Sequence, residues 1–205
     1  MADQPTSQGR VNLSAAQRDA ASCRRCHLWQ KATQTVFGAG PRNAAIMFVG
    51  EQPGDVEDRE GEPFVGPAGR LLRDALAEAG IDADAVYLTN TVKHFKWREG
   101  GKRRIHERPN REEILACRMW LDIEIAAVKP RVLVALGATA ASVIMPGAKV
   151  TRDRAKPLAS PLAQRVTVTV HPSSILRAVD SRARAAAWRQ FVDDLRAIAR
   201  MAPSH

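Results

Sequence analysis

Short apolar runs that alternate with amphipathic segments constrain the fold of this chain more than any other feature. Four runs have the length of buried strands: residues 44–49, 85–88, 131–136 and 166–170. Five segments space their apolar residues at the helical period: residues 13–22, 67–79, 111–128, 138–144 and 183–200. This alternation predicts a three-layer α/β/α fold, in which helices cover both faces of a central, mainly parallel four-stranded sheet.

The 205 residues have the size of one generous domain, and a hydrophobic content of 45% is ample for its core. We predict a single domain over residues 13–200, after a disordered or frayed N-terminus at 1–12. No apolar run approaches the roughly 18 residues of a membrane span, and the N-terminus lacks the apolar core of a signal peptide. We therefore expect a cytoplasmic protein without membrane contact, and a monomer.

Polar residues gather where the predicted strands end. Gly50-Glu51-Gln52 follow the first strand, Thr89-Asn90 the second and His171-Pro172-Ser173 the last. In parallel α/β sheets, ligands bind at the carboxyl ends of the strands. The three clusters are therefore expected to form one site.

A strongly basic segment, KHFKWREGGKRRIHER, spans residues 93–108. It holds seven Lys and Arg against two Glu, in a chain whose net charge is +9. We expect an inserted loop outside the core that meets a polyanion, most simply nucleic acid, with Phe95 and Trp97 available to stack on bases or to pack on the body. By composition alone, His106 in this loop is one more phosphate contact.

The three cysteines and one histidine of the basic segment form a candidate metal site. Cys23 and Cys26 make a CxxC pair, and Cys117 lies on the predicted helix 111–128. Three thiols leave a four-coordinate site one ligand short, and the imidazole of His94 can complete it. Spacing does not separate zinc from an iron–sulfur cluster, and a buried Cys117 that acts as a small hydrophobe is the alternative.

Six sequence blocks together resemble the uracil-DNA glycosylase superfamily. The blocks are GEQPGD (50–55), PFVGPAGR (63–70), YLTNTVK (87–93), CRMWL (117–121), LGATA (136–140) and HPSSILR (171–177). Their order and spacing are similar to those of the iron–sulfur enzymes called family 4, and the resemblance covers roughly residues 20–200.

Two departures from family 4 resemble its UdgX-type branch. His94 stands where family 4 has a cysteine, and the inserted segment contains KRRIH (102–106), the hallmark of that branch. The resemblance implies that His106 attacks the deoxyribose and leaves the protein covalently attached to DNA. It also implies a structural [4Fe-4S] cluster, rather than zinc, on four ligands: Cys23, Cys26, His94 and Cys117.

The resemblance further implies a uracil pocket at the predicted strand ends. Gly50 and Gln52 contribute to this pocket, and Phe64 is a stacking platform for the flipped base. Asn90 carries a donor and an acceptor that match O4 and N3–H of uracil, whereas cytosine presents the wrong edge. His171 is placed to donate to O2, where charge builds as the uracil anion leaves. Without the resemblance, Asn90 would be a turn residue and His171 a strand-end histidine.

Three side chains are candidates for work at the sugar. Glu51, and as a weaker candidate Asp55, can orient a histidine or a water, or stabilise positive charge at C1′. Neutral imidazole is a competent nucleophile near neutral pH, and it is a poor leaving group once bonded to an anomeric carbon. An adduct of His106 with C1′ is therefore expected to persist.

Further DNA contacts are expected from the basic segment and from HPSSILR. The expected phosphate ligands are Lys102, Arg103, Arg104, Ser173 and Ser174. The residues available to fill the space left by the flipped nucleotide are Ile175, Leu176 and Arg177.

The sequence thus predicts a uracil-DNA glycosylase that acts on uracil-containing, preferably single-stranded DNA and becomes cross-linked through His106. Two alternatives stay open. One is a family-4-like glycosylase that turns over with water as its nucleophile. The other is a non-catalytic module that recognises uracil-containing or abasic single strands.

Overall fold

The structure, a computed structural model, describes residues 12–101 and 103–202. Its central sheet has four strands: β1 (Ile46–Gly50), β2 (Tyr87–Asn90), β5 (Val132–Leu136) and β6 (Arg165–Thr169). Neighbouring strands are parallel throughout, in the order β2-β1-β5-β6. The predicted α/β fold is therefore confirmed.

Helices and short 3-10 turns connect these strands. The helices are α1 (Leu13–Ala21), α2 (Asp55–Glu60), α3 (Pro67–Glu78), α4 (Arg111–Val128), α5 (Gly137–Ile144), α6 (Val150–Asp153), α7 (Pro172–Leu176) and α8 (Ser181–Met201), and the 3-10 turns are η1 (His27–Gln30) and η2 (Ala83–Ala85). No helix in the described part of the chain is both long enough and apolar enough to cross a membrane.

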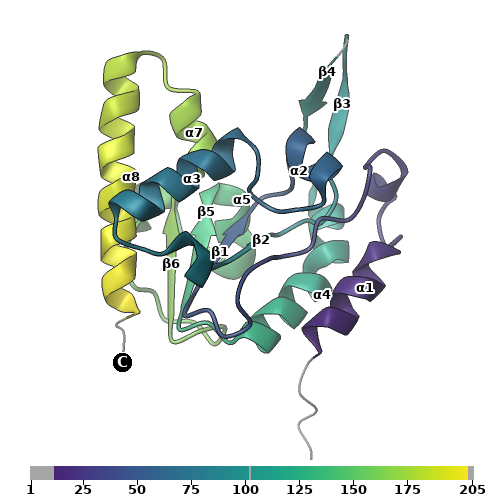
Figure 1. Ribbon diagram of the computed structural model, residues 1–205, viewed down its shortest axis with the longest axis horizontal. Coiled ribbons are helices and arrows are strands. Elements are labelled where there is room, and N and C mark those ends of the chain that lie inside the picture. Colours follow the sequence, from purple (N-terminus) through teal and green to yellow (C-terminus); the bar gives the residue numbers. More distant parts are fainter. Residues whose placement is uncertain (1–11, 102, 203–205) are drawn as a thin grey trace, which may run out of the picture.

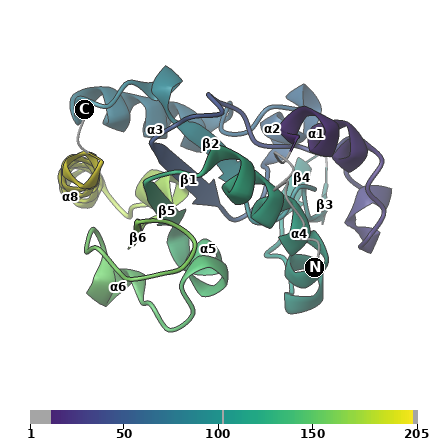
Figure 2. The same ribbon diagram turned by 90° about the horizontal axis from the view of Figure 1, so that it is seen from below.

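Two helical layers bury the two faces of the sheet (Figures 1 and 2). In β1, Met47 and Val49 pack with α1, α4 and α5, whereas Ile46 and Phe48 pack with α3, α7 and α8. Because successive side chains of a strand point to opposite faces, an uninterrupted apolar run is what a sheet covered on both sides requires.

The strand order places a topological switch point between β1 and β5. From β1 the chain crosses to β2 at one edge, then returns to β5 on the other side of β1. Connections that leave in opposite directions open a crevice above the carboxyl ends of the two strands. Residues that follow β1 and β5 therefore face each other at this end of the sheet.

Local signals set several helix boundaries as predicted. Helix α4 has the predicted bounds, because the side chain of Asn110 accepts from the Glu113 N–H and the Glu113 carboxylate accepts from the Asn110 N–H. Pro67 is the first residue of α3, and Gly80 beyond its end has φ +76°. The polar segment 51–66, for which the sequence predicts neither helix nor strand, contains the short helix α2.

The basic segment 93–108 is not the open loop that its charge predicted. Lys93, His94 and Phe95 are buried, and Lys93 Nζ lies 2.6 Å from Glu124 Oε2 of α4. A buried carboxylate thus neutralises the first lysine. The rest forms an antiparallel hairpin of β3 (Trp97–Gly100) and β4 (Arg103–His106), which projects from the body beside α2 (Figure 1).

Candidate active site

A cavity of about 930 Å³ opens at the carboxyl edge of the sheet. Glu51 follows β1, Asn90 ends β2 and His171 follows β6, and all three line this cavity. The structure therefore brings residues from the three strand ends around one space, as their positions predicted. His106 reaches the same cavity from the end of β4.

One wall of the cavity depends on two glycines. A Cβ at Gly50 would overlap the amide oxygen of Asn90 and lie 2.8 Å from Phe64 Cζ. Phe64 has φ +59°, a costly conformation for a bulky residue, and a Cβ at Gly69 would collide with its backbone. The Phe64 ring stacks on His171, with centroids 6.2 Å apart and planes at 27°. Backbone strain of this kind marks a position whose geometry matters.

His171 is held as a neutral hydrogen-bond donor. Its Nδ1 accepts from the Ser173 N–H at 3.2 Å and lies 2.9 Å from the Ser173 hydroxyl. A ring nitrogen that accepts carries no proton, so Nε2 bears the N–H. Burial, with Arg177 and His106 nearby, lowers the pKa of His171 to about 4. The imidazole is therefore uncharged at neutral pH, with Nε2–H available to the cavity.

His106 and Glu51 face each other across the switch point. His106 Nε2 lies 3.5 Å from Glu51 Oε1, while Glu51 Oε2 accepts from the Thr139 hydroxyl. Arg108 Nε lies 3.0 Å from Thr139 Oγ1 and 3.7 Å from Glu51 Oε2. Partial burial lowers the pKa of His106; Glu51 opposes this shift and Arg177 adds to it. His106 is therefore mainly neutral at pH 7, with a nitrogen lone pair available.

Arg104 fastens the hairpin to α2. Its Nη1 lies 2.6 Å from Oδ2 of the fully buried Asp58, and its Nε donates to Asp55. The guanidinium lies 5.3 Å from the ring centroid of Phe95 and 5.4 Å from that of Trp97. Arg104, predicted to hold phosphate, and Asp55, predicted to act at the sugar, are thus engaged with each other. Their contacts fix the strand that carries His106.

Gln52 is engaged in a similar way at the base of the hairpin. Its side-chain amide donates to the carbonyls of Lys96 and Glu107, at 3.2 and 2.9 Å, and accepts from the Lys96 N–H at 3.1 Å. Gln52 lines the cavity as predicted, but its side chain serves the hairpin. Its side chain is therefore not available to a ligand in the cavity.

The residues predicted to contact DNA lie at different depths. Arg103, Ser174 and Arg177 are exposed, whereas Ser173 uses its hydroxyl on His171. Lys102 lies outside the described residues. Ile175 is buried, so it cannot fill the space of a flipped nucleotide, while Leu176 and Arg177 line the cavity and can.

Three cysteines gather where α1 meets α4. Trp120 Nε1 donates to Cys23 Sγ and the Lys93 N–H donates to Cys117 Sγ, both at 3.2 Å. Burial raises the pKa of Cys117 to about 12, and the nearby Cys26 and Cys23 add to the shift. N–H donors directed at sulfur suit thiolate ligands. The chemistry of the donor set therefore fits a thiolate-bound group.

The fourth expected ligand is less favourably placed. His94 Nε2 lies 3.0 Å from the Thr35 hydroxyl. Within the described residues, no three His, Cys, Asp or Glu side chains stand in an arrangement that could hold a metal ion. A shared ligand shell would thus require these side chains to rearrange toward a common centre.

Sequence comparison agrees with the geometry of the cavity. Residues 37–196 match the uracil DNA glycosylase superfamily. The chain belongs to this superfamily. Its central sheet and the cavity at the strand ends lie within the matched region.

Several relatives are described as type-4 uracil-DNA glycosylases. The chain is 42% identical to that of Thermotoga maritima over 157 residues, 76% of this chain and 78% of the relative. It is 35% identical to that of Pyrobaculum aerophilum over 167 residues, 76% of this chain and 80% of the relative. It is 42% identical to that of Sulfurisphaera tokodaii over 127 residues, but spans only about half of that relative (54%).

Two residues of this superfamily member's site were not singled out from the sequence. Thr139 contacts Glu51 although 88 residues separate them. Its signal was present in LGATA, where a polar residue lies three positions beyond the third predicted strand, much as Glu51 lies two positions beyond the first. Arg108 was counted only as one more base of the basic segment, and its approach to Glu51 needed the hairpin to form.

Proposed function

We propose that this protein excises uracil from DNA, preferably single-stranded DNA. The observation that carries the proposal is the neutral His171 in the same cavity as Asn90 and Phe64. Its Nε2–H is suited to donate to O2 of a departing uracil anion, and the Asn90 amide matches O4 and N3–H. The similarity to type-4 uracil-DNA glycosylases supports it. A single strand presents a base without the cost of breaking a pair.

We further propose that excision ends in a bond between His106 and C1′ of the deoxyribose, the outcome that the UdgX-type branch suggests. This rests on the approach of His106 Nε2 to Glu51 Oε1 at the cavity edge, 3.5 Å apart, and on the lowered pKa of His106. A neutral imidazole is nucleophilic, and a carboxylate beside it stabilises the positive charge that the ring gains on attack. Water and imidazole would compete for the same carbon, and the position of His106 beside Glu51 at the cavity favours the imidazole.

Excision exchanges one bond at C1′ for another. The C1′–N1 bond breaks and its electron pair leaves with uracil, whose developing charge at O2 His171 stabilises. The lone pair of His106 Nε2 then forms the new bond to C1′. The imidazolium loses its Nδ1 proton to solvent, and the uracil anion takes up a proton from water. The products are free uracil and a neutral histidine–deoxyribose linkage.

Glu51 is suited to stabilise the positive charge that builds at C1′ and then on the His106 ring. The Thr139 hydroxyl donates to one of its oxygens, and this leaves the other directed at His106. A carboxylate next to an oxocarbenium-like centre lowers the barrier to its formation. Asp55 is bound to Arg104, so we assign it to the support of the hairpin rather than to the sugar.

We propose that Cys23, Cys26, Cys117 and His94 hold a [4Fe-4S] cluster. Such a cluster would supply structural cross-linking between α1, α4 and the base of the hairpin, and would take no part in bond cleavage. The N–H donors on Cys23 and Cys117 support this assignment. Iron, sulfide and zinc analysis of purified protein tests it, because stoichiometric zinc in a colourless protein would overturn it.

A denaturing gel tests the proposed reaction. The protein is incubated with a single-stranded oligonucleotide that contains one uracil, and free uracil is measured alongside. A shift that survives heat and SDS, with one uracil released per protein chain, supports the covalent mechanism. Repeated uracil release without a shift would instead identify a glycosylase that uses water. If neither free uracil nor a shift is observed, the protein is a non-catalytic binding module.

A further inference from the structure

A second groove continues from the active-site cavity across the surface between α3, α7 and α8. It encloses about 550 Å³ and shares two residues, Pro67 and Leu176, with the wall of the active-site cavity. We call it the flanking groove. A strand that places one nucleotide in the cavity must continue on the surface, and this groove begins where the cavity ends.

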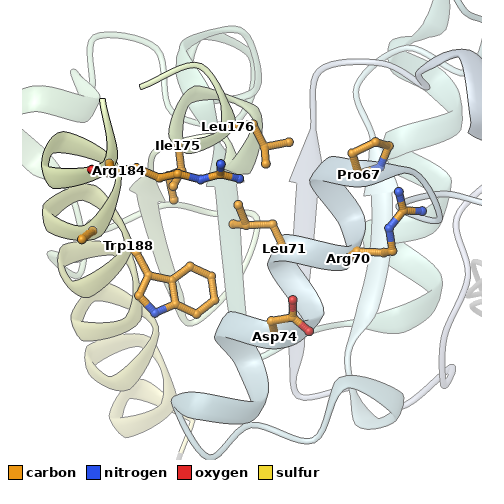
Figure 3. A pocket seen from close by; sticks show the side chains of 10 residues that line it. Pro67, Arg70, Leu71, Asp74, Ile175, Leu176, Arg184 and Trp188 are labelled. Carbon is orange, nitrogen blue, oxygen red and sulfur yellow. The ribbon is translucent and has the colours of Figure 1, made fainter. Parts of the chain in front are cut away.

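Cationic side chains reach the flanking groove from two helices. Arg70 of α3 lies near Pro67, and Arg184 of α8 reaches toward Leu176 (Figure 3). Both are exposed, and neither forms an ion pair with a carboxylate in the part of the chain that is described; Arg70 donates to the Val65 carbonyl at 3.2 Å. This contrasts with Arg104, whose charge is neutralised by two aspartates. Unpaired guanidinium groups on a groove are suited to phosphate.

An aromatic side chain lies deeper in the same groove. Trp188 of α8 is partly buried, and its Nε1–H donates to Glu78 Oε2 at 2.9 Å, which fixes the ring. The buried side chains of Leu71 and Ile175 line the groove beside it (Figure 3). A fixed indole against an apolar floor is a sequence-tolerant platform for a nucleobase. Asp74 also lines the groove, at the end away from Leu176.

We propose that the flanking groove binds the single strand on one side of the target uracil. Arg70 and Arg184 hold its phosphates, and Trp188 stacks on one of its bases. The identity of the ligand, single-stranded DNA, rests on the proposed function. The position of the binding site rests on the continuity of the groove with the cavity and on its charge complementarity to phosphate. It assigns a role in DNA binding to α8, which lies outside the polar strand ends and the hairpin.

Equilibrium binding of a fluorescent single strand without uracil tests the groove independently of catalysis. The double variant Arg70→Ala, Arg184→Ala should bind about tenfold more weakly at low salt. Its log–log salt slope should be shallower by about 1.4, because each phosphate contact to a single strand contributes about 0.7. The matched control is Arg189→Ala, an exposed arginine on the same helix outside the groove. Equal binding of the double variant and this control would overturn the proposal.

Substitution of Trp188 tests the stacking. Trp188→Leu should weaken binding several-fold, whereas Trp188→Phe, which keeps an aromatic face but loses the bond to Glu78, should restore most of it. If Trp188 has a purely structural role, the binding of both variants should instead follow their melting temperatures, and this result would reject the stacking.

Oligonucleotides shortened from either side of a uracil then locate the groove on the strand. One of the two truncations, and not the other, should abolish the difference between wild type and the double variant in the rate of adduct formation or uracil release. A difference that survives both truncations would overturn the proposal. If wild type releases no uracil, the proposed function fails while the binding experiment still decides on the groove. Normal DNA binding with altered self-association would assign the groove to a second copy of the chain, and reject the proposal.

Discussion

Loss of the Arg104 side chain should detach the hairpin and remove His106 from the cavity. While the hairpin of Arg104→Ala is docked, the carboxylate of Asp58 lies in a buried site and keeps only the Thr33 N–H, at 3.0 and 3.1 Å in the wild-type structure, among its partners from outside α2. To break a buried ion pair by removing one partner costs about 3–5 kcal/mol. Because the side chain of Arg104 is 16% exposed and that of Asp55 39%, we take the lower end, about 3 kcal/mol.

A cost of about 3 kcal/mol corresponds to a change of roughly 150-fold in the equilibrium between docked and detached hairpin. The rate of adduct formation should fall by up to this factor, since only the docked hairpin places His106 beside Glu51. A time course on denaturing gels measures this rate. Uracil release should fall less, because His171 and Asn90 do not depend on the hairpin.

The matched control for Arg104→Ala is Arg98→Ala on the neighbouring strand. Its side chain is 59% exposed and makes a 3.7 Å ion pair with Glu107, a contact worth at most about 1 kcal/mol. The double variant Arg104→Ala, Asp58→Asn should recover part of the lost rate, because no buried charge is then left unpaired. An adduct rate for Arg104→Ala equal to that of Arg98→Ala would refute the reasoning.

Three further predictions concern the site. His106→Ala should abolish the gel shift, and persistence of the adduct would exclude His106 as the linkage. In wild type, the rate of adduct formation should hold at pH 6.5 and above and fall only at lower pH, because the pKa of His106 is lowered and its neutral form attacks. The pKa of His171 is lowered to about 4, so stability that is present above pH 6.5 should be lost between pH 6.5 and 4, by up to about 3 kcal/mol. The variant His171→Asn, which keeps an N-cap side chain, should flatten the profile of melting temperature against pH. An unchanged profile would contradict this. Cys117→Ser should lower the iron content per chain, measured by metal analysis, whereas normal iron would remove Cys117 from the ligand set.

Elements with a strong periodic pattern could be predicted from the sequence, and elements set by tertiary contacts could not. Helix α4 was predicted to the residue, because its capping box and apolar period are local properties. Helix α2 was missed, since its buried residues are Glu57 and Asp58, and no apolar stripe marks it. The Glu57 carboxylate accepts from the N–H of Gly54, which is a local capping contact, and from the N–H of Gly66, a contact that only the folded loop creates.

The hairpin carried a local signal that its charge obscured. Gly100 ends β3 opposite Arg103, and Gly101 follows it with φ +62°, so the glycine pair lies where the chain turns. Seven Lys and Arg side chains within residues 93–108 predict a polyanion-binding loop, because so many charges are unusual in a core. Buried carboxylates reverse that expectation at two of them, Lys93 with Glu124 and Arg104 with Asp58. Ion pairs across 31 and 46 residues leave no local pattern.

The sequence by itself determined the parallel sheet, the strand ends where the site lies and the residue types that can serve it. Strand pattern and turn chemistry depend on near neighbours, so they can be read along the chain. Tertiary structure alone decided which charged side chains pair within the protein and which remain available to a ligand. It committed Gln52, Asp55 and Arg104 to the hairpin and joined Thr139 to Glu51. Among the described residues it gave Arg70 and Arg184 no carboxylate partner, because electrostatic partnership depends on distance in space and not along the chain.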